Sequence, residues 1–81
     1  MRTESARWLI TGGSGFLRRH LIFALKAKGF FVRSLSLDPV TKVEDLKKLR
    51  VDIHHGDILD QKALQKALDD MTIVVHLAGE N

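Results

Sequence analysis

The chain has 81 residues, of which 44% are hydrophobic and 28% are charged, and its net charge is +3. A chain of this length forms one small domain that buries only about 60% of its unfolded surface. Because it contains no cysteine, disulfides and thiolate metal sites are excluded, as suits a reducing cytoplasm. No apolar run approaches the roughly 20 residues of a membrane span, and the N-terminus lacks the apolar core of a signal peptide. We expect a single cytoplasmic domain over residues 1–81, with no membrane contact.

Positive charge gathers in the first half of the chain. Residues 1–40 carry seven Arg and Lys against two acids, a net charge of +5, and residues 41–81 carry six against eight, a net charge of −2. A basic half can attract an anionic cofactor or nucleic acid. There is no basic run, aromatic stacking platform or helix-turn-helix spacing, so we expect no nucleic-acid partner. Lys26, Lys28 and Arg33 alternate with apolar positions and are interpreted as solvated surface.

The first half of the chain predicts a strand, a helix and a second strand. A strand is expected over residues 7–11. From Gly15 the sequence predicts a helix, whose apolar stripe would consist of Leu17, Leu21, Ala24, Leu25 and Lys28. Gly29 should end this helix, because glycine readily adopts a positive φ. The branched and aromatic run over residues 30–37 predicts the second strand.

The second half continues the alternation. A capping box predicts a short helix over residues 42–49, and alternating residues predict a strand over 51–54. Asp60 is placed to cap a helix over residues 61–68, which consists of strong helix formers. The apolar run over residues 72–77 predicts the last strand.

This βαβαβαβ order predicts an α/β fold with a doubly wound parallel sheet. Right-handed crossovers place helices on both faces of the sheet. The expected strand order is 3-2-1-4, which is Rossmann-like, with a binding crevice between the first and fourth strands where the winding direction changes.

A glycine-rich turn, T-G-G-S-G-F-L at residues 11–17, joins the first strand to the first helix. Glycines let the backbone approach an anion closely, and the N–H groups of the helix's first turn point at it. No Gly-Lys-Ser/Thr follows, so this turn is not a P-loop. The pattern indicates a site for the pyrophosphate of a dinucleotide.

Three motifs resemble the extended short-chain dehydrogenase/reductase superfamily, in its NAD-dependent epimerase/dehydratase group. The turn at 11–17 is similar to that group's T-G-G-x-G-F-I-G. H-G-D-I-L-D at 55–60 is similar to its G-D-x-x-D, and V-V-H-L-A-G at 74–79 to its V-x-H-L-A-A/G. The matches span nearly the whole chain and correspond to the N-terminal half of such a protein.

The resemblance implies a set of cofactor-binding residues. The pyrophosphate would be bound by the glycine turn, through Gly12, Ser14, Gly15, Phe16 and Leu17. Asp57 would accept a hydrogen bond from the adenine amino group, with Ile58 against the ring; the alternative for Asp57 is a turn or cap residue. The crevice near the adenosine and the nicotinamide ribose would be lined by Leu77, Ala78 and Gly79. The alternative for Leu77 is a core residue.

Two positions depart from the group's pattern. Arg18 occupies the place of the third glycine, which lets the helix pack closely on the sheet. An arginine there either pushes the helix away and weakens binding, or sends its guanidinium toward the phosphates. Ser36 occupies the place of the acid that binds the ribose of NAD, with Asp38 two residues later.

The cofactor therefore stays open between NAD and NADP. V-R-S-L-S-L-D-P at 32–39 also resembles the V-R-A-x-V-R-D-P of plant-reductase-like members, whose arginine holds the 2′-phosphate of NADP. Leu37 stands at that arginine's position.

Neither a metal site nor a catalytic residue is expected in this chain. Neighbouring strand residues face opposite sides of a sheet, so His54 and His55 cannot both face one ion. The resemblance implies a Tyr-x-x-x-Lys pair for catalysis, and the chain contains no tyrosine.

We expect a domain that binds NAD or NADP and resembles the N-terminal half of an epimerase/dehydratase or reductase, inactive alone. The alternatives are a nucleotide-sensing module and a scaffold or interaction domain that has lost its cofactor. The apolar edge from Thr72 to Leu77 invites pairing with another chain. It predicts a homodimer with an antiparallel junction and an eight-stranded sheet.

Overall fold

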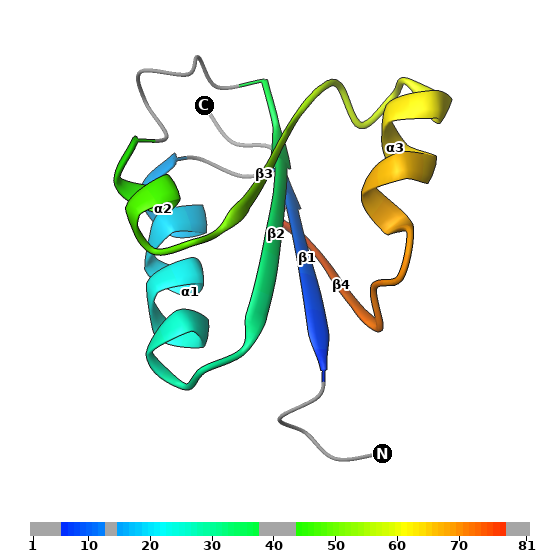
Figure 1. The fold of residues 1–81 in the computed structure, drawn as a ribbon. Coiled ribbons are helices and arrows are strands. Elements are labelled where there is room, and N and C mark those ends of the chain that lie inside the picture. The colour runs from blue at the N-terminus through cyan, green and yellow to red at the C-terminus, as the bar shows by residue number, and fades with distance from the viewer. Residues whose placement is uncertain (1–5, 13–14, 38–43, 78–81) are drawn as a thin grey trace.

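A computed structural model describes residues 6–12, 15–37 and 44–77 (Figure 1). Within these ranges four strands form one parallel sheet in the order β3-β2-β1-β4. Figure 1 shows α1 and α2 on one side of this sheet and α3 on the other. The elements are β1 (Arg7–Gly12), α1 (Gly15–Ala27), β2 (Phe31–Ser36), α2 (Glu44–Lys48), β3 (Asp52–His55), α3 (Gln61–Leu68) and β4 (Ile73–Leu77). The predicted fold class and strand order are confirmed.

All three described helices are followed by a residue with a positive φ, which after α3 is Asp70 with φ +67°. After α1, Gly29 has φ +86° and its N–H donates to the Lys26 carbonyl at 2.9 Å, as predicted. After α2, Arg50 takes the same role with φ +65°, and the Val51 N–H donates to the Leu46 carbonyl at 3.1 Å. Because Val51 takes part in this helix cap, β3 begins one residue later than predicted.

The predicted N-cap of α3 is confirmed. The Asp60 carboxylate accepts hydrogen bonds from the backbone N–H groups of Lys62 at 3.0 Å and Ala63 at 3.4 Å. The helix spans the predicted residues. For α2, part of the predicted capping box, including Thr41, lies outside the described residues, and the described helix begins at Glu44.

The predicted apolar stripe of α1 is confirmed in part, because Leu25 is buried and Leu21 packs against the core. Leu17 is 49% exposed, and Ala24 and Lys28 are exposed as well. The residues that α1 buries are Arg18, Ile22 and Leu25. This set is offset by one residue from most of the predicted stripe, or about 100° around the axis. Apolar residues cover much of the circumference of α1. The sequence periodicity therefore predicts a helix, but it does not determine which side of the helix faces the sheet.

The core lies on both faces of the sheet. Leu9 and Ile10, successive residues of the central strand β1, point to opposite faces and are both fully buried. On the face of α1 and α2, the buried residues are Ile10, Ile22, Leu25, Val32, Leu46 and Val51. On the face of α3, they are Leu9, Leu35 and Ala67.

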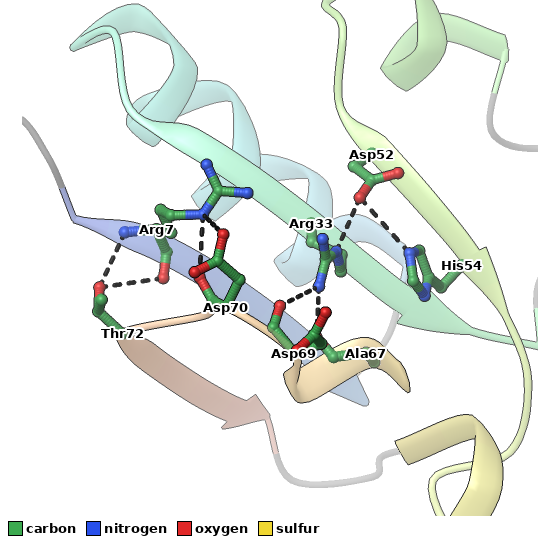
Figure 2. A network of polar contacts seen from close by, with 8 residues as sticks. All are labelled: Arg7, Arg33, Asp52, His54, Ala67, Asp69, Asp70 and Thr72. Atoms are coloured by element: carbon green, nitrogen blue, oxygen red, sulfur yellow. Dashed lines mark hydrogen bonds and ion pairs between the residues drawn. The ribbon is translucent and has the colours of Figure 1, made fainter. Parts of the chain in front are cut away.

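Arg33 joins α3 to the sheet, so its interpretation as solvated surface is wrong (Figure 2). Its side chain is 11% exposed, and its Nε donates to Asp52 Oδ2 of β3 at 2.7 Å. Its Nη1 donates to the carbonyls of Ala67 and Asp69 at the end of α3, at 2.9 and 2.8 Å. One guanidinium thereby satisfies groups from β3 and from the last turn of α3.

Arg7 holds the connection between α3 and β4 (Figure 2). Its Nε donates to the Asp70 carbonyl at 2.9 Å, and its backbone N–H donates to Thr72 Oγ1 at 2.9 Å. The guanidinium also lies over the ring of Phe31, 3.9 Å from its centroid. These contacts join β1 and β2 to the segment that leads into β4.

Candidate functional site

The carboxyl ends of β1, β2 and β3 surround a cavity of about 240 Å³. Its described lining comes from three separate segments: the end of β1 with the first turn of α1, the end of β2, and the turn after β3. The lining residues are Gly12, Arg18, Leu35, Ser36, Leu37, Gly56, Asp57 and Ile58. Five of these are predicted site residues, namely Gly12, Arg18, Ser36, Asp57 and Ile58.

Gly12 lets β1 and β4 meet at the start of the glycine turn. It has φ +71°, a conformation that L side chains rarely adopt. A Cβ there would lie 2.5 Å from the Leu77 carbonyl oxygen and 3.0 Å from His76 Cε1. Only glycine fits this position without displacing backbone.

Leu77 lies opposite Gly12 in the parallel register of β1 and β4. Its side chain is partly buried and packs against the core of the α1 face, as its alternative interpretation predicted. The remaining site residues of this segment, Ala78 and Gly79, lie outside the described residues, as do Ser14 and Asp38.

A hydrogen bond that the sequence analysis missed joins the end of β1 to the end of β4. Thr11 Oγ1 and His76 Nδ1 are 2.8 Å apart, and Thr11 is buried. Both residues belong to motifs noted above, and the parallel register places them opposite each other. The predicted neighbouring of the first and fourth strands could therefore have indicated this pair.

The first turn of α1 lies beside the cavity. Gly15 begins the helix, and Phe16 and Leu17 are exposed there. The Phe16 ring stacks with that of His20, with centroids 6.2 Å apart. The predicted site residues Gly15, Phe16 and Leu17 do not line the cavity.

Arg18 is buried in the wall of the cavity, with 2% of its surface exposed. Its Nη1 donates to the Gly12 carbonyl at 3.1 Å, so the guanidinium lies against the backbone of the glycine turn. α1 nevertheless packs on the sheet, because Ile22, one turn later, is fully buried. Of the two outcomes predicted for an arginine at this position, the side chain points toward the turn and the helix stays in contact with the sheet.

The end of β2 contributes Ser36 and Leu37 to the cavity. Ser36 is partly buried, and its carbonyl accepts a hydrogen bond from the Gly56 N–H at 2.9 Å. This bond continues the pairing of β2 with β3 by one residue. It brings the serine that replaces the expected acid next to the turn after β3.

The turn after β3 supplies Asp57 and Ile58. A Cβ on Gly56 would lie 2.9 Å from the Ala63 Cβ, so glycine permits the close approach of this turn to α3. Asp57 Oδ1 accepts a hydrogen bond from the Leu59 N–H at 2.9 Å, and its carbonyl accepts one from the Asp60 N–H at 2.9 Å. Asp57 is thus both a turn residue and part of the cavity wall.

Three larger hollows among the described residues contain no predicted site residue. One, of about 540 Å³, lies between α1 and α2, one, of about 630 Å³, lies beside β3 and α3, and one, of about 530 Å³, lies along α3. Among the described residues, no group of three or more His, Cys, Asp or Glu is arranged to hold a metal ion. The predicted residues gather at the smaller cavity.

Beside the first of these hollows, an ion pair joins α1 to α2. Arg19 Nε and Nη2 donate to the two oxygens of Asp45, at 2.9 and 3.2 Å. The hydrogen bond from Arg19 lowers the pKa of the Asp45 carboxyl below its usual value of 3.8. This pair connects the two helices on their solvent-facing side.

Together, the 3-2-1-4 sheet, the glycine turn after β1 and the cavity at the strand ends define a Rossmann-like α/β domain. Residues 9–81 match the family model of the 3-beta hydroxysteroid dehydrogenase/isomerase family. The chain belongs to this family, and the predicted resemblance to epimerases and reductases is confirmed.

Named relatives agree with this assignment. The chain is 35% identical, over 98% of its length, to the isoflavone reductase homolog P3 of Arabidopsis thaliana, and covers 28% of that protein. It is 30% identical, over 90% of its length, to the UDP-glucose 4-epimerase of Dictyostelium discoideum, and covers 24% of it. For a Mycobacterium tuberculosis 3 beta-hydroxysteroid dehydrogenase/Delta 5-->4-isomerase, the values are 31% identity over 98% of the chain and 20% of the relative.

The chain thus spans a fifth to somewhat over a quarter of the length of these relatives. Within the described residues, no helix is long and apolar enough to cross a membrane.

Proposed function

We propose that this chain binds the adenosine half of NAD or NADP in the cavity at the ends of β1, β2 and β3. One observation carries the proposal: predicted cofactor residues from three separate segments line the same cavity. Its volume of about 240 Å³ is below the roughly 300–1,000 Å³ of a complete ligand pocket. It suits one part of a dinucleotide.

The proposed roles follow from position. Gly12 keeps the start of the turn free of side chains, so that the backbone can approach the pyrophosphate. Asp57, which Leu59 holds in the turn, accepts a hydrogen bond from the adenine amino group, with Ile58 against the ring. Ser36 lies at the end of β2, where the ribose hydroxyls belong in this fold.

We propose that the chain binds and orients the cofactor without completing a reaction alone. The nicotinamide would supply hydride transfer, while a proton donor must come from a protein side chain. The tyrosine of the implied Tyr-x-x-x-Lys pair does not occur in the 81 residues. The names of the relatives support an oxidoreductase or epimerase as the class of the complete activity.

Calorimetric titration of the purified chain with NAD and with NADP tests this proposal. We expect saturable binding of at least one of them, displaced by ADP-ribose because that ligand contains the adenosine half. The fluorescence of Trp8, the single tryptophan, confirms that the protein is folded in the same sample. Absence of binding to the folded chain would contradict the proposal and favour a scaffold domain that has lost its cofactor.

The exposed edge of β4 supports the alternative of a scaffold or interaction domain. Among the described strands, β4 pairs with β1 alone. Its residues Ile73–Leu77 include no Asp, Glu, Lys or Arg, and Val74 is 49% exposed. The opposite edge, β3, carries Asp52. Uncharged edges invite strand pairing.

We propose that two copies pair antiparallel through β4. Sedimentation velocity over a range of concentrations should show a dimer that Val74→Lys shifts to the monomer, because a charge at the junction opposes pairing. Lys28→Gln, remote from β4, is the control. A native chain that stays monomeric at the highest concentration refutes the dimer.

A further inference from the structure

We propose that Arg18 is a specificity-determining residue that makes the site prefer a phosphate on the adenosine ribose, and therefore NADP over NAD. This inference rests on the proposed function, in which the cavity takes the adenosine half. It assigns a role to a side chain that replaces the small residue expected at that position of the glycine turn.

Arg18 presents a positioned positive charge to the cavity. The residue is 2% exposed and still lines the cavity wall, so its charge is already withdrawn from bulk water. The bond from Nη1 to the Gly12 carbonyl, at 3.1 Å, sets where the guanidinium lies. An anion that enters such a site gains from a cation that needs little reorganisation.

The end of β2 lies in the same cavity and carries a neutral residue. Ser36 stands where sites for NAD place a carboxylate that binds the ribose hydroxyls and repels a 2′-phosphate. The Ser36 hydroxyl can donate a hydrogen bond to the phosphate, and it carries no charge that would repel it. Ser36 and Arg18 line one cavity of about 240 Å³, so a ribose substituent at the end of β2 lies in the field of the guanidinium.

Among the described residues of the cavity wall, the other charged one is Asp57. Its carboxylate is held at the turn after β3 by the Leu59 N–H, at 2.9 Å from Oδ1. That turn is the adenine end in the proposed function. The positive charge of Arg18 thus comes from α1, and the negative charge of Asp57 comes from the turn after β3, on a different wall of the cavity.

Guanidinium groups suit phosphate because their planar N–H donors form paired, charge-assisted hydrogen bonds. A hydrogen bond to a charged group contributes roughly 1.5–3 kcal/mol, which corresponds to about a tenfold to a hundredfold change in affinity. We therefore expect NADP to bind at least about tenfold more tightly than NAD. Raising the salt concentration should weaken NADP binding more than NAD binding.

The first experiment uses the native chain. NADP, NAD, adenosine 2′,5′-bisphosphate, adenosine 3′,5′-bisphosphate and ADP are titrated separately at one ionic strength. We expect the 2′-phosphate ligands to bind more tightly than NAD, ADP and the 3′-phosphate isomer, because the charge must lie at the end of β2. Equal affinities for NADP and NAD overturn the inference. Equal affinities for the 2′ and 3′ isomers overturn it too. They would show that the site attracts any additional phosphate, without recognising its position on the ribose.

Variants then assign the preference to Arg18. Arg18→Met keeps much of the buried side-chain volume, removes the charge and should lower the affinity for NADP much more than the affinity for NAD, so that the ratio of the two affinities approaches one. Arg18→Lys should restore part of the preference. The matched control is Lys28→Gln, which removes an exposed charge just beyond the end of α1 and should keep the native ratio. A preference that survives in folded Arg18→Met refutes the assignment.

The two levels of the proposal fail differently. If no dinucleotide binds to the folded native chain, the proposed function is wrong. If both bind equally, the function stands and the role of Arg18 is wrong. If Arg18→Met does not fold, as judged by Trp8 fluorescence and circular dichroism, the native ligand series and Arg18→Lys still decide the inference.

Discussion

Gly12→Ala is expected to destabilise the domain far more than the same change at Gly29. Both glycines have a positive φ, +71° and +86°. For any L residue this backbone conformation costs roughly 1–2 kcal/mol. The two positions differ in space: a Cβ on Gly12 would lie 2.5 Å from the Leu77 carbonyl oxygen, whereas nothing lies within 4 Å of a Cβ on Gly29.

The magnitude follows from this difference. Relief of the contact at Gly12 requires the backbone of β4 to move, and overpacking of this kind costs about 1–3 kcal/mol. Gly12→Ala should therefore lose roughly 2–5 kcal/mol of unfolding free energy, and Gly29→Ala roughly 1–2 kcal/mol. A domain of 81 residues has about 4–12 kcal/mol in total, so Gly12→Ala removes a large share.

Urea unfolding followed by Trp8 fluorescence measures both changes. Gly29→Ala is the matched control, because it isolates the cost of the positive φ. If Gly12→Ala costs no more than Gly29→Ala, the close approach of β1 and β4 at the glycine turn is refuted.

Three further changes test contacts away from the cavity. Arg33→Met should cost about 2–4 kcal/mol in urea unfolding, because it leaves two carbonyls of the α3 end without their donor and removes the guanidinium from Asp52, whose Oδ2 keeps His54 Nε2 at 3.4 Å. Arg50→Gly should raise the unfolding free energy by up to about 1 kcal/mol, because glycine adopts φ +65° without strain. Asp45→Asn should cost less than about 1 kcal/mol at neutral pH, since the side chain is 48% exposed. Pairing with Arg19 lowers the pKa of Asp45 in the folded state. The ion pair therefore stabilises the fold fully above about pH 3.8, the ordinary pKa of this carboxyl, and this stabilisation is lost as the pH falls through the lowered pKa.

Each of these three predictions can be contradicted by a specific result. A surface-like cost below about 0.5 kcal/mol for Arg33→Met would show that α3 does not depend on the guanidinium. Destabilisation by Arg50→Gly would contradict the strained helix end. Stability curves of native chain and Asp45→Asn that stay parallel from neutral to strongly acidic pH would contradict the linked titration. A gap between them that narrows on acidification agrees with it.

Local signals predict the type and order of the elements well. Asp60 followed by strong helix formers specifies the start of α3, and Gly29 the end of α1, because caps and turns depend on a few adjacent residues. The alternation of strands and helices then restricts the sheet to the observed order, since right-handed crossovers leave few topologies. The sequence placed the binding crevice between the first and fourth strands, whereas the described cavity lies at the ends of β1, β2 and β3.

Other features required the folded chain. The rotation of α1 follows from which side meets the sheet. Because the helix is apolar on more than one side, the sequence pattern placed Leu21 and Leu25 correctly on the core side and missed Ile22. Arg33 was interpreted as surface because its partners, Asp52, Ala67 and Asp69, lie 19, 34 and 36 residues away. Arg50 gives no sequence signal of a positive φ, because its conformation comes from the helix end that precedes it.

The sequence alone specified a parallel α/β sheet, a glycine turn at the switch between β1 and β4, and a family whose members use these features. Each of these depends on contacts within a short segment or on rules of chain connection. Where Arg18 lies, how it meets Gly12, and how Thr11 pairs with His76, 65 residues away, depend on the packing of segments distant in sequence. Those contacts form only when α1 and β4 dock on β1, and no local pattern encodes their geometry.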